Sequence, residues 1–600
     1  MCGIAGIIRT ESDNYNLEPP IHSMRKALNH RGPDDSGIYI SQNGQVTLAH
    51  TRLAILDLSS AGHQPMSVND GRYYIVFNGE IYNFQELREN LLSPDEQFNS
   101  RTDTEVILKL YQKLGSDCVH HLRGMFAFAI WDNYEKTCFI ARDPLGIKPL
   151  YYWLSGSKLI FASELRAILA SGLPEIKLSQ EGLYGYLTSG SVPEPHTLIE
   201  GVHCLEAGHW LHWQAGNLRK SQYWQINFAP EYTTVSESIA RVREALIDSV
   251  KHHFVSDVPV GVFLSGGIDS SAIVSLSREV ESGSLNTFSI VFDEQEWNEG
   301  DLAQRVAEKF GTHHTEYKIT ASVGKSLLPK YLDSIDQPSM DGFNTFCVSK
   351  IAHESGMKVV LSGLGGDEFF GGYKSFQKIP QMIRLSQQLQ PIKPLVKSVG
   401  MGMERWGSSI KVRRLGDFLQ QAPNSATAYR TFRGIFSHWE ACQILKYYFP
   451  DHKILSQSRQ SIEDINANQY SVADEVSKLE IGNYMRNQLL KDSDVMSMSW
   501  GLELRVPLVD RILLESIATI PSEIRLAAGK QLLIKAVGNL PDWIINRPKT
   551  GFSFPFERWM NSEWQDYFQE INCPSNVLLT SWYRRWSLAI LQHWLQKISN

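Results

Sequence analysis

The sequence contains little cysteine, and its cysteines follow no pairing pattern. Among 600 residues there are 7 cysteines, at 2, 118, 138, 204, 347, 442 and 573, and no two form a C-x-x-C motif. Zinc ribbons and disulfide frameworks need such repeated spacings. The odd, scattered set therefore excludes both and indicates a reducing compartment, for which we expect the cytoplasm.

Long hydrophobic runs and an excess of basic residues are also missing. Nowhere do eighteen apolar residues follow one another, and the apolar start is too short for an export signal. The chain has 58 Lys and Arg against 65 Asp and Glu, a formal net charge of -7. Nucleic-acid and membrane-surface binding favour clustered Lys and Arg. We therefore expect neither nucleic acid nor a membrane as a partner.

The pattern of apolar and polar residues differs between the first and the second part of the chain. At 600 residues the chain is too long for a single hydrophobic core. Up to about residue 215, short runs such as "QVTLAHTRLAILDL" and "RYYIVFNGEIYN" alternate with turn signals and predict antiparallel sheet. A polar linker follows. Later, short apolar runs alternate with helical segments, which is typical of a parallel sheet covered on both faces, and from about 375 the pattern is mostly helical. We predict two domains, 2–215 and 235–600.

The segment "VPVGVFLSGGIDSSAIVSL" carries the strongest chemistry. A buried strand leads into a small-residue turn and a helix, so backbone N–H groups and the helix N-terminus can bind phosphate. Asp269 would repel phosphate unless a cation lay between them, so it implies Mg²⁺. The whole string resembles the pyrophosphate loop of ATP pyrophosphatases. The predicted ATP-binding residues here are Leu264, Ser265, Gly266, Gly267, Asp269 and Ser270.

A second loop, "KVVLSGLGGDEFFGGY", repeats strand, turn and acid about a hundred residues later. Ser362 and Gly363 can approach the nucleotide, and Asp367 can supply a second carboxylate to the metal. Both loops are expected at the carboxyl ends of parallel strands, where ligands bind. Lys530, in "AAGKQLLIKAV", could neutralise phosphate charge as the transition state forms. Cleavage of ATP to AMP and pyrophosphate would activate a carboxylate for attack by an amine.

Cys2 follows the first methionine directly. Removal of that methionine would give one residue both a thiol and an α-amine, whose pKa near ~8 suits a general base. Downstream, Asn78 and Gly79 could form an oxyanion hole for attack by the thiol on an amide, and Arg52 could hold a substrate carboxylate. Glu80 and Asp103 could recognise an α-ammonium group.

Five segments of the first half, "MCGIAGI", "HRGPDDSG", "HTRLAILD", "FNGEIYN" and "RDPLGIKPLYY", resemble the class II glutamine amidotransferase domain. With "LSGGIDSS", "SGLGGDE" and "GLELRVPLVD" after them, the order is similar to that of the glutamine-hydrolysing asparagine synthetases. The resemblance implies an N-terminal-nucleophile αββα sandwich, followed by an ATP-pyrophosphatase-type doubly wound parallel α/β domain with a helical C-terminal part.

The resemblance also implies roles for individual residues. Cys2 would be the nucleophile, Asn78 and Gly79 the oxyanion hole, and the glutamine-binding residues would be Arg52, Asn78, Glu80 and Asp103. Leu264 and Ile290 would line the nucleotide pocket with Ser362 and Gly363, while Asp269 and Asp367 would bind magnesium-pyrophosphate. The family further implies a homodimer and an ammonia tunnel, for which "MFAFAIW" is a candidate wall, although plain core strand explains that segment as well.

One departure concerns the acceptor. The family's second loop usually reads S-G-E-G-x-D-E, and its glutamate is associated with forming the aspartyl adenylate, but here Leu364 stands at that position. Gln337 replaces an acid that many members have. We expect both changes to alter the acceptor pocket. Aspartate remains the first expectation, and an amidotransferase for another carboxylate, on a surface glycan or a peptide, is the alternative. A cyclase is disfavoured because Cys2 is kept.

Two further classes stay open. A non-catalytic sensor would be expected to have lost one of the loops, yet Cys2, Asn78, Asp269 and Asp367 are all present. A sugar-phosphate amidotransferase would not need the ATP-cleaving loop. Release of pyrophosphate with glutamine separates these possibilities.

Overall fold

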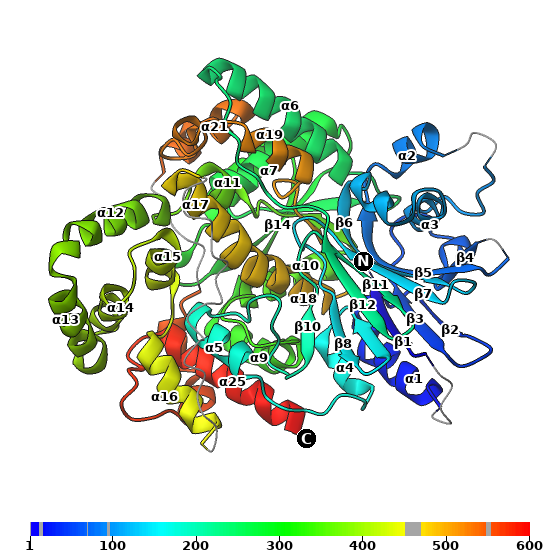
Figure 1. Cartoon of the computed structure of the whole chain (residues 1–600). Coiled ribbons are helices and arrows are strands. Elements are labelled where there is room, and N and C mark those ends of the chain that lie inside the picture. The colour runs from blue at the N-terminus through cyan, green and yellow to red at the C-terminus, as the bar shows by residue number, and fades with distance from the viewer. Residues whose placement is uncertain are drawn as a thin grey trace.

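The computed structural model of the chain describes residues 2–10, 16–68, 70–92, 96–450, 470–547 and 554–599. Three sheets organise them, two of six strands and one of five. The two six-stranded sheets lie on the right of Figure 1, and the chain after residue 235 lies to their left and above them. Each half thus has its own sheet system.

The first half is a four-layered sandwich of antiparallel sheets and helices. Its first sheet has the order β10-β8-β9-β1-β3-β2 and its second β12-β11-β7-β6-β5-β4. Side chains such as Ile4 and Leu48 from the first sheet pack between the sheets against Val76 and Trp131 from the second. Helices α1, α4 and α5 cover the outer face of the first sheet, and α2 and α3 that of the second. The predicted αββα sandwich is confirmed.

The elements of this half have the following bounds: β1 Gly3–Ile8, α1 Glu18–Ala27, β2 Asp35–Ile40, β3 Val46–Arg52, β4 Met66–Val68, β5 Tyr73–Ile81, α2 Phe84–Asn90, α3 Asp103–Leu114, β6 Gly124–Asp132, β7 Thr137–Arg142, β8 Tyr151–Ser155, β9 Lys158–Ala162, α4 Leu165–Ala170, α5 Gln180–Ser189, β10 Val202–Cys204, β11 His209–Gln214 and β12 Asn217–Gln222.

The second half is built on a parallel sheet of order β15-β14-β13-β16-β17. Its strands are β13 Val260–Phe263, β14 Asn286–Phe292, β15 His313–Ile319, β16 Val359–Leu361 and β17 Glu503–Arg505. The short apolar runs predicted as strands in this half form its centre, as β14, β13 and β16. The edge strands were not predicted, because β15 alternates polar residues and β17 is only three residues long, two of them charged.

Helices make up most of the rest of this half, as predicted for its C-terminal part. Their bounds are α6 Val235–His253, α7 Ile268–Val280, α8 Gly300–Phe310, α9 Ala321–Ser334, α10 Phe343–Glu354, α11 Gly366–Phe370, α12 Ser375–Gln388, α13 Lys393–Trp406, α14 Ile410–Leu419, α15 Ser425–Arg433, α16 His438–Tyr448, α17 Val472–Leu479, α18 Lys491–Met498, α19 Arg511–Ala518, α20 Ser522–Arg525, α21 Gln531–Val537, α22 Asp542–Ile545, α23 Phe556–Met560, α24 Gln565–Phe568 and α25 Trp582–Ser599. A π-helical segment, η7 Glu480–Leu490, joins α17 to α18.

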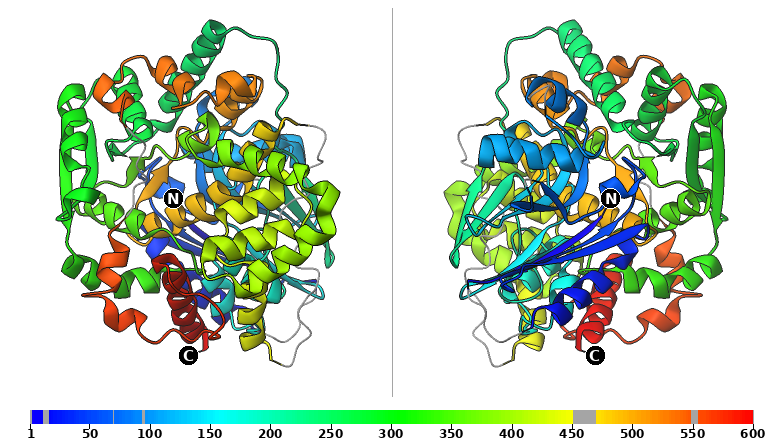
Figure 2. Two further views of the ribbon diagram at one scale, coloured as in Figure 1. Left: turned by 90° about the vertical axis from the view of Figure 1, so that its left-hand side faces the viewer. Right: turned by 90° about the vertical axis from the view of Figure 1, so that its right-hand side faces the viewer.

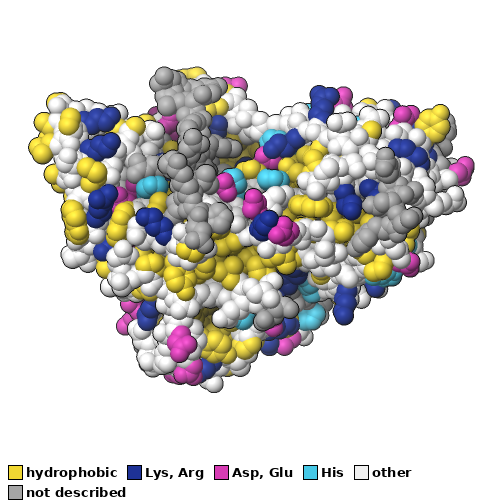
Figure 3. Space-filling view, turned by 60° about the horizontal axis from the view of Figure 1, so that its bottom comes forward, with side chains coloured by type: hydrophobic (Ala, Val, Ile, Leu, Met, Phe, Trp, Pro, Cys, Tyr) yellow, Lys and Arg dark blue, Asp and Glu magenta, His cyan; other side chains and the backbone are white. Residues whose placement is uncertain are grey.

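The C-terminal helix α25 returns to the first half, where it lies beside α5 and α9 in Figure 1 and at the lower end of the molecule in both views of Figure 2. The hydroxyl of Tyr186, on α5, donates to the carbonyl of Ser587 on α25 at 2.7 Å. None of the helices in the described part of the chain combines the length and hydrophobicity that crossing a bilayer requires. On the face shown in Figure 3, basic and acidic side chains are interspersed among hydrophobic and neutral ones.

Buried arginines of the first half hold carboxylates of the second. The fully buried Arg31 donates from Nη1 to Glu164 Oε1 at 2.8 Å, and its Nη2 lies 2.8 Å from Asp494 Oδ2 on α18. Arg123 donates from Nε and Nη2 to both carboxylate oxygens of Asp510, each at 3.0 Å. Because a buried charge without its partner is costly, these pairs fix how the halves dock.

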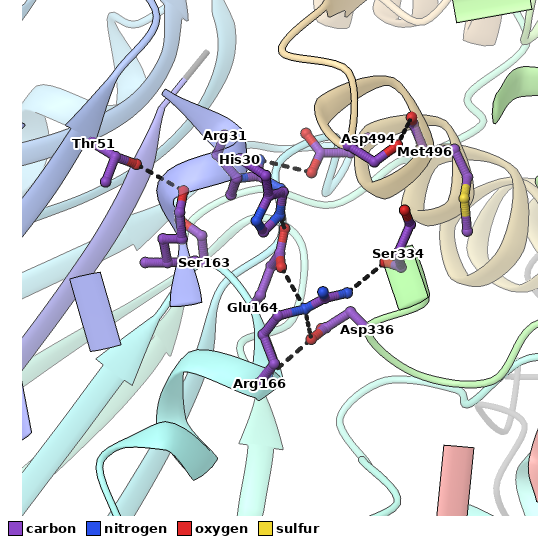
Figure 4. Close-up of polar contacts among 12 residues, drawn as sticks. His30, Arg31, Thr51, Ser163, Glu164, Arg166, Ser334, Asp336, Asp494 and Met496 are labelled. Atoms are coloured by element: carbon purple, nitrogen blue, oxygen red, sulfur yellow. Dashed lines mark hydrogen bonds and ion pairs between the residues drawn. The ribbon is translucent and has the colours of Figure 1, made fainter. Parts of the chain in front are cut away.

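Figure 4 shows how the Arg31 pair continues into a network. Glu164 Oε2 lies 2.9 Å from Nε of Arg166. The carboxylate of Asp336, from the second half, accepts the backbone N–H groups of Leu165 and Arg166, both at 2.9 Å. Charges of both signs therefore alternate across the boundary, and each buried carboxylate there has a donor.

Replacing Arg31 with methionine should destabilise the protein strongly. The substitution keeps much of the side-chain volume but leaves Glu164 and Asp494 buried without their shared cation, which costs about 3–5 kcal/mol. The measurement is the urea midpoint of unfolding, with Lys26→Met, an exposed α1 position, as the control. Equal midpoints for the two variants would show that the Arg31 network does not hold the halves together.

Candidate active sites

Cys2 lies at the start of β1, in the middle of the first sheet between β3 and β9. Packing leaves no room for a side chain at the next residue: a Cβ on Gly3 would lie 2.6 Å from Thr51 Oγ1 and 2.8 Å from Leu28 Cβ. The backbone of Cys2 is held at both ends, because its N–H donates to Asn78 Oδ1 at 2.9 Å and its carbonyl accepts from Arg31 Nε at 3.0 Å. Cys2 therefore has a fixed position.

The thiol of Cys2 is only 8% exposed, and burial raises its pKa. The neutral thiol is thus favoured, so a nearby base is needed to use it as a nucleophile. Its own nitrogen would become such a base on removal of the preceding methionine, which would turn it into an α-amine. That nitrogen is the atom that contacts Asn78.

The predicted oxyanion donors lie beside Cys2 on β5. The Nδ2 of Asn78 is buried and has no hydrogen-bond partner among the described residues, which is unusual for a buried donor. Gly79 has a φ of +154°, and a Cβ there would lie 2.1 Å from the carbonyl oxygen of Met125. Only glycine fits this backbone. The unpaired Asn78 amide matches the need of an oxyanion hole for a donor.

Three of the predicted glutamine-binding residues, Arg52, Glu80 and Asp103, line one small cavity of about 30 Å³ together with Cys2 and Gly79. The fourth, Asn78, contacts the backbone of Cys2 but is not part of this lining. Arg52 is positioned by its own loop, since its guanidinium donates to the carbonyls of Asp57 at 2.5 Å and Ser59 at 2.9 Å. Five of the six residues predicted for this site, separated by up to a hundred positions along the chain, therefore surround this cavity.

Two carboxylates of this cavity are buried. Asp103 begins α3, which Thr102 caps by accepting the N–H of Glu105 at 3.3 Å, and its Oδ2 accepts the N–H of Ile81 at 2.9 Å. Burial raises the pKa of Asp103 to about 6. Burial, with Glu503 nearby, raises the pKa of Glu80 well above its usual range. Both would be stabilised in the charged form by a cationic group of a ligand.

Arg505 was missed by the sequence analysis. This fully buried residue of β17 donates from Nε to Glu503 Oε1 at 2.6 Å, and its Nη2 lies 3.6 Å from Glu80 Oε2. Its carbonyl accepts the N–H of Ser362 at 2.9 Å. One residue therefore touches the small cavity of the first half and a predicted nucleotide loop of the second. The available signal was the pair of charges in the otherwise apolar "LELRVPLV".

The predicted nucleotide residues line a larger cavity of about 270 Å³ at the carboxyl ends of β13 and β16, which are neighbours in the sheet. Leu264, Ser265, Asp269, Ser270, Ile290, Ser362, Gly363 and Leu364 all contribute to its wall. The two loops touch, since a Cβ on Gly363 would lie 2.7 Å from the nitrogen of Ser270. Gly266 and Gly267, also predicted to bind the nucleotide, form the turn between β13 and α7 and are not part of this lining; Gly266 has a φ of +70°.

The two predicted metal ligands converge on one cation. Nζ of Lys530 donates to Asp269 Oδ2 at 2.5 Å and forms an ion pair with the carboxylate of Asp367. Lys530 precedes α21 in a left-handed conformation, with φ +58°, and is 5% exposed. Burial lowers the pKa of Lys530, but the two carboxylates raise it by more. A pair of carboxylates that shares an ammonium also suits Mg²⁺, which takes one or two carboxylates with phosphate and water.

Gln337 does not line the nucleotide cavity, contrary to the expectation for the acceptor pocket. Its side chain faces the first half, where Oε1 accepts the N–H of Leu198 at 3.0 Å and Nε2 donates to the hydroxyl of Tyr151 at 3.2 Å. An amide can donate and accept at once, which this boundary position uses. Leu364, by contrast, lies in the cavity wall as expected.

Comparisons with known proteins match both halves. A family model described as a glutamine amidotransferase domain matches residues 1–224, and one described as asparagine synthase matches residues 241–596. The glutamine-hydrolyzing asparagine synthetase 1 of Bacillus subtilis (strain 168) is 34% identical over 597 residues, covering 95% of this chain and 90% of that protein. The putative glutamine-hydrolyzing asparagine synthetase 2 of Methanocaldococcus jannaschii is 40% identical over 430 residues, covering 66% and 81%.

Among solved structures, one titled "Structure of the allosteric regulatory enzyme of purine biosynthesis" covers 53% of this chain and 80% of its own, at a TM-score of 0.30 and 16% identity. A similarity this low carries no argument about the chain.

Removing the Lys530 ammonium should leave Asp269 and Asp367 able to bind Mg²⁺ in its place. Lys530→Met leaves two carboxylates facing each other and should lower the free energy of unfolding by about 2–4 kcal/mol. We expect MgCl₂ to raise the melting temperature of this variant more than that of the unsubstituted protein, because Mg²⁺ can replace the ammonium. Lys535→Met, at an exposed site on α21, is the control. No added response to MgCl₂ would count against a metal site here.

Proposed function

This chain belongs to the asparagine synthetase family, and on that premise we propose how its two sites share one reaction. The chain is an ATP-dependent, glutamine-hydrolysing ligase that forms asparagine. Glutamine, aspartate, ATP and water give glutamate, asparagine, AMP and pyrophosphate. The observation that carries the assignment of sites is that Cys2 contacts Asn78 and lines one cavity, while the nucleotide loops line another. Arg505 contacts Glu80 at the first cavity and Ser362 at the second.

We assign the release of ammonia to Cys2. The α-amine takes the thiol proton, and the sulfur attacks the amide carbon of glutamine. The oxygen that becomes negative accepts hydrogen bonds from Asn78 Nδ2 and the N–H of Gly79, which suit such a charge in a buried site. The α-amine passes the proton to the departing nitrogen, which leaves as ammonia, and water then hydrolyses the thioester to glutamate and restores the thiol.

Recognition of glutamine is assigned to charged groups of the same cavity. The Arg52 guanidinium binds the α-carboxylate, for which its planar donor geometry is suited. Asp103 and Glu80 bind the α-ammonium, which would hold their carboxylates in the charged form. Because the cavity is small, the substrate's own charges replace water around these groups.

Activation of aspartate is assigned to the second cavity. The side-chain carboxylate of aspartate attacks the α-phosphorus of ATP, so that pyrophosphate leaves and an aspartyl adenylate forms. Ser265, Ser270, Ser362 and Gly363 present hydroxyl and backbone groups to the nucleotide, and Lys530 balances charge on the leaving phosphates. We propose that Asp269 and Asp367 hold Mg²⁺, which when bound neutralises pyrophosphate charge.

Ammonia must then reach the adenylate without becoming ammonium, which cannot attack. We propose that it passes through the apolar boundary between the halves, where Met125 of β6 packs in one cluster with Leu53, Tyr82 and residues of the parallel sheet. Exclusion of water from this region would keep the amine neutral. A homodimer and a cytoplasmic location are proposed as well; the seven free cysteines fit a reducing compartment.

The direct test is incubation with ATP, Mg²⁺, glutamine and aspartate. Asparagine and pyrophosphate should appear in equal amounts. The matched relatives support aspartate as acceptor rather than a glycan or peptide carboxylate. Glutamate without pyrophosphate would indicate amination of another substrate class, and no turnover would indicate a sensor; either result would overturn the proposed function.

Cys2→Ala should abolish asparagine synthesis from glutamine but leave synthesis from added ammonium chloride within about threefold, because only the first site uses the thiol. Both activities are measured by amino-acid analysis of the products. Cys118→Ala, at another buried cysteine of the same half, should keep both. If Cys2→Ala loses both activities, the thiol has a structural role.

The glutamine-dependent reaction should weaken as the solution becomes acidic. The pKa of Asp103 is raised to about 6 by burial, so its carboxylate becomes protonated as the pH falls through that value and no longer pairs with the α-ammonium. We expect kcat/KM for glutamine to fall tenfold per pH unit below about 6. Ammonium-driven synthesis should show no such fall when its rate is expressed per concentration of free, unprotonated ammonia. In Asp103→Asn the inflection should vanish. Its persistence there would assign the titration to another group.

A further inference from the structure

The nucleotide cavity has a second region that no nucleotide motif accounts for. Besides the two phosphate loops, its wall includes the start of α10, with Asp341, and the junction of η7 and α18, with Leu489, Asp492 and Ser493. These two segments touch each other, since a Cβ on Gly342 would lie 3.3 Å from Cβ of Asp492. Leu364 belongs to the same cavity wall, so this region adjoins the position where the acceptor was expected.

Two carboxylates face this region without a cation. Asp492 is 6% exposed, and its Oδ2 accepts a hydrogen bond from the hydroxyl of Ser339 at 2.5 Å. Asp341 Oδ1 accepts the N–H of Gly342 at 2.8 Å. Neither carboxylate forms an ion pair within the described ranges, although most buried charges do so. Lysine and arginine are absent from the described wall of the cavity.

The nearest cation along the chain serves a different cavity. Lys491 precedes Asp492, but its side chain lines a separate small cavity with Tyr151 and Cys204, and its Nζ lies 5.9 Å from the centre of the Tyr151 ring. Burial, and then the charge of Asp341, raises the pKa of Asp492 well above its usual range. The two carboxylates thus lack a positive partner that would stabilise both of them in the charged form.

Ser493 provides an independent sign of a ligand. It is 7% exposed and lines the cavity, yet its hydroxyl makes no hydrogen bond to the described residues. Polar side chains of residues this buried usually have a hydrogen-bond partner. A donor–acceptor group next to two carboxylates matches an ammonium, which has three N–H donors.

We propose that Asp341 and Asp492 bind the α-ammonium of the acceptor amino acid, with the Ser493 hydroxyl as a third contact. They are specificity-determining residues for the adenylation step, and the assignment rests on the proposed function. Held there, aspartate would direct its side-chain carboxylate toward the nucleotide loops. Leu364 cannot supply the negative charge of the glutamate that the family usually has there. Asp341, just before α10, and Asp492, on α18, would supply it instead.

The chemistry predicts an order among acceptors. Succinate is aspartate without the ammonium and should lose the contact with both carboxylates. The α-amide of aspartate keeps the ammonium and loses only the α-carboxylate, for which the described wall offers no lysine or arginine. We expect kcat/KM to fall for succinate by roughly 30-fold to several thousand-fold, as for loss of one partner of a buried charged pair, and to fall less for the α-amide.

The experiment measures pyrophosphate release with ATP, Mg²⁺ and ammonium chloride, so that the glutamine site is not needed. Asp492→Asn and Asp341→Asn should raise KM for aspartate and lower its kcat/KM by about 30-fold or more. Their kcat/KM for succinate should change by less than about threefold, and KM for ATP should be unchanged. Asp542→Asn, at an exposed site on α22, is the control.

Three results would overturn the assignment. One is equal use of succinate and aspartate by the unsubstituted protein, which needs no variant to fold. Another is an equal loss of both acceptors in the two variants at unchanged melting temperature, which would indicate a structural role. Absence of pyrophosphate with every acceptor would overturn the proposed function and this assignment with it, and so is distinguishable from the other two.

Discussion

The arrangement of the whole molecule depends on buried charges that cross from one half to the other. Arg31 reaches Asp494, Arg123 reaches Asp510, and Arg505 reaches Glu80. An apolar interface alone could slide with little loss of energy. A buried arginine allows much less movement, because sliding would separate it from its carboxylate partner in a region without water to solvate either charge.

This constraint matters because ammonia is useful only if it arrives unprotonated. The two cavities must stay connected through an interface from which water is excluded, and the interface must not open during turnover. Arg505 belongs to both sides of this arrangement. Its guanidinium faces Glu80 of the first cavity, and its carbonyl receives the N–H of Ser362 in the second. A change in the charge of Glu80 at the first cavity therefore acts on the same residue, Arg505, that holds the backbone of Ser362 at the second.

The cavities differ in how they use carboxylates. In the first, Glu80 and Asp103 share a small space with Arg52, which fits a ligand that carries both charges. In the second, Asp269 and Asp367 converge on Lys530, whereas Asp341 and Asp492 have no cation among the described residues. Carboxylates thus occur in three environments: near the Arg52 guanidinium, around the Lys530 ammonium, and without a cation of the chain, where a ligand could pair with them.

The local motifs could be predicted from the sequence. Apolar runs followed by small-residue turns placed β13 and β16 with their loops, because these signals depend on neighbouring residues. The strand Glu503–Arg505 could not be predicted from so short a charged segment, since only pairing with β16 makes it a strand.

By itself, the sequence determined the two-part chemistry: a thiol with amide and carboxylate partners, then phosphate loops with acids. Only the tertiary structure decided which groups meet. Lys530 lies between Asp269 and Asp367 although more than 160 residues separate it from either, Gln337 faces away from the cavity, and Asp341 meets Asp492 beside Leu364. The physical reason is that burial and pairing of charge depend on distances in space, which spacing along the chain does not specify.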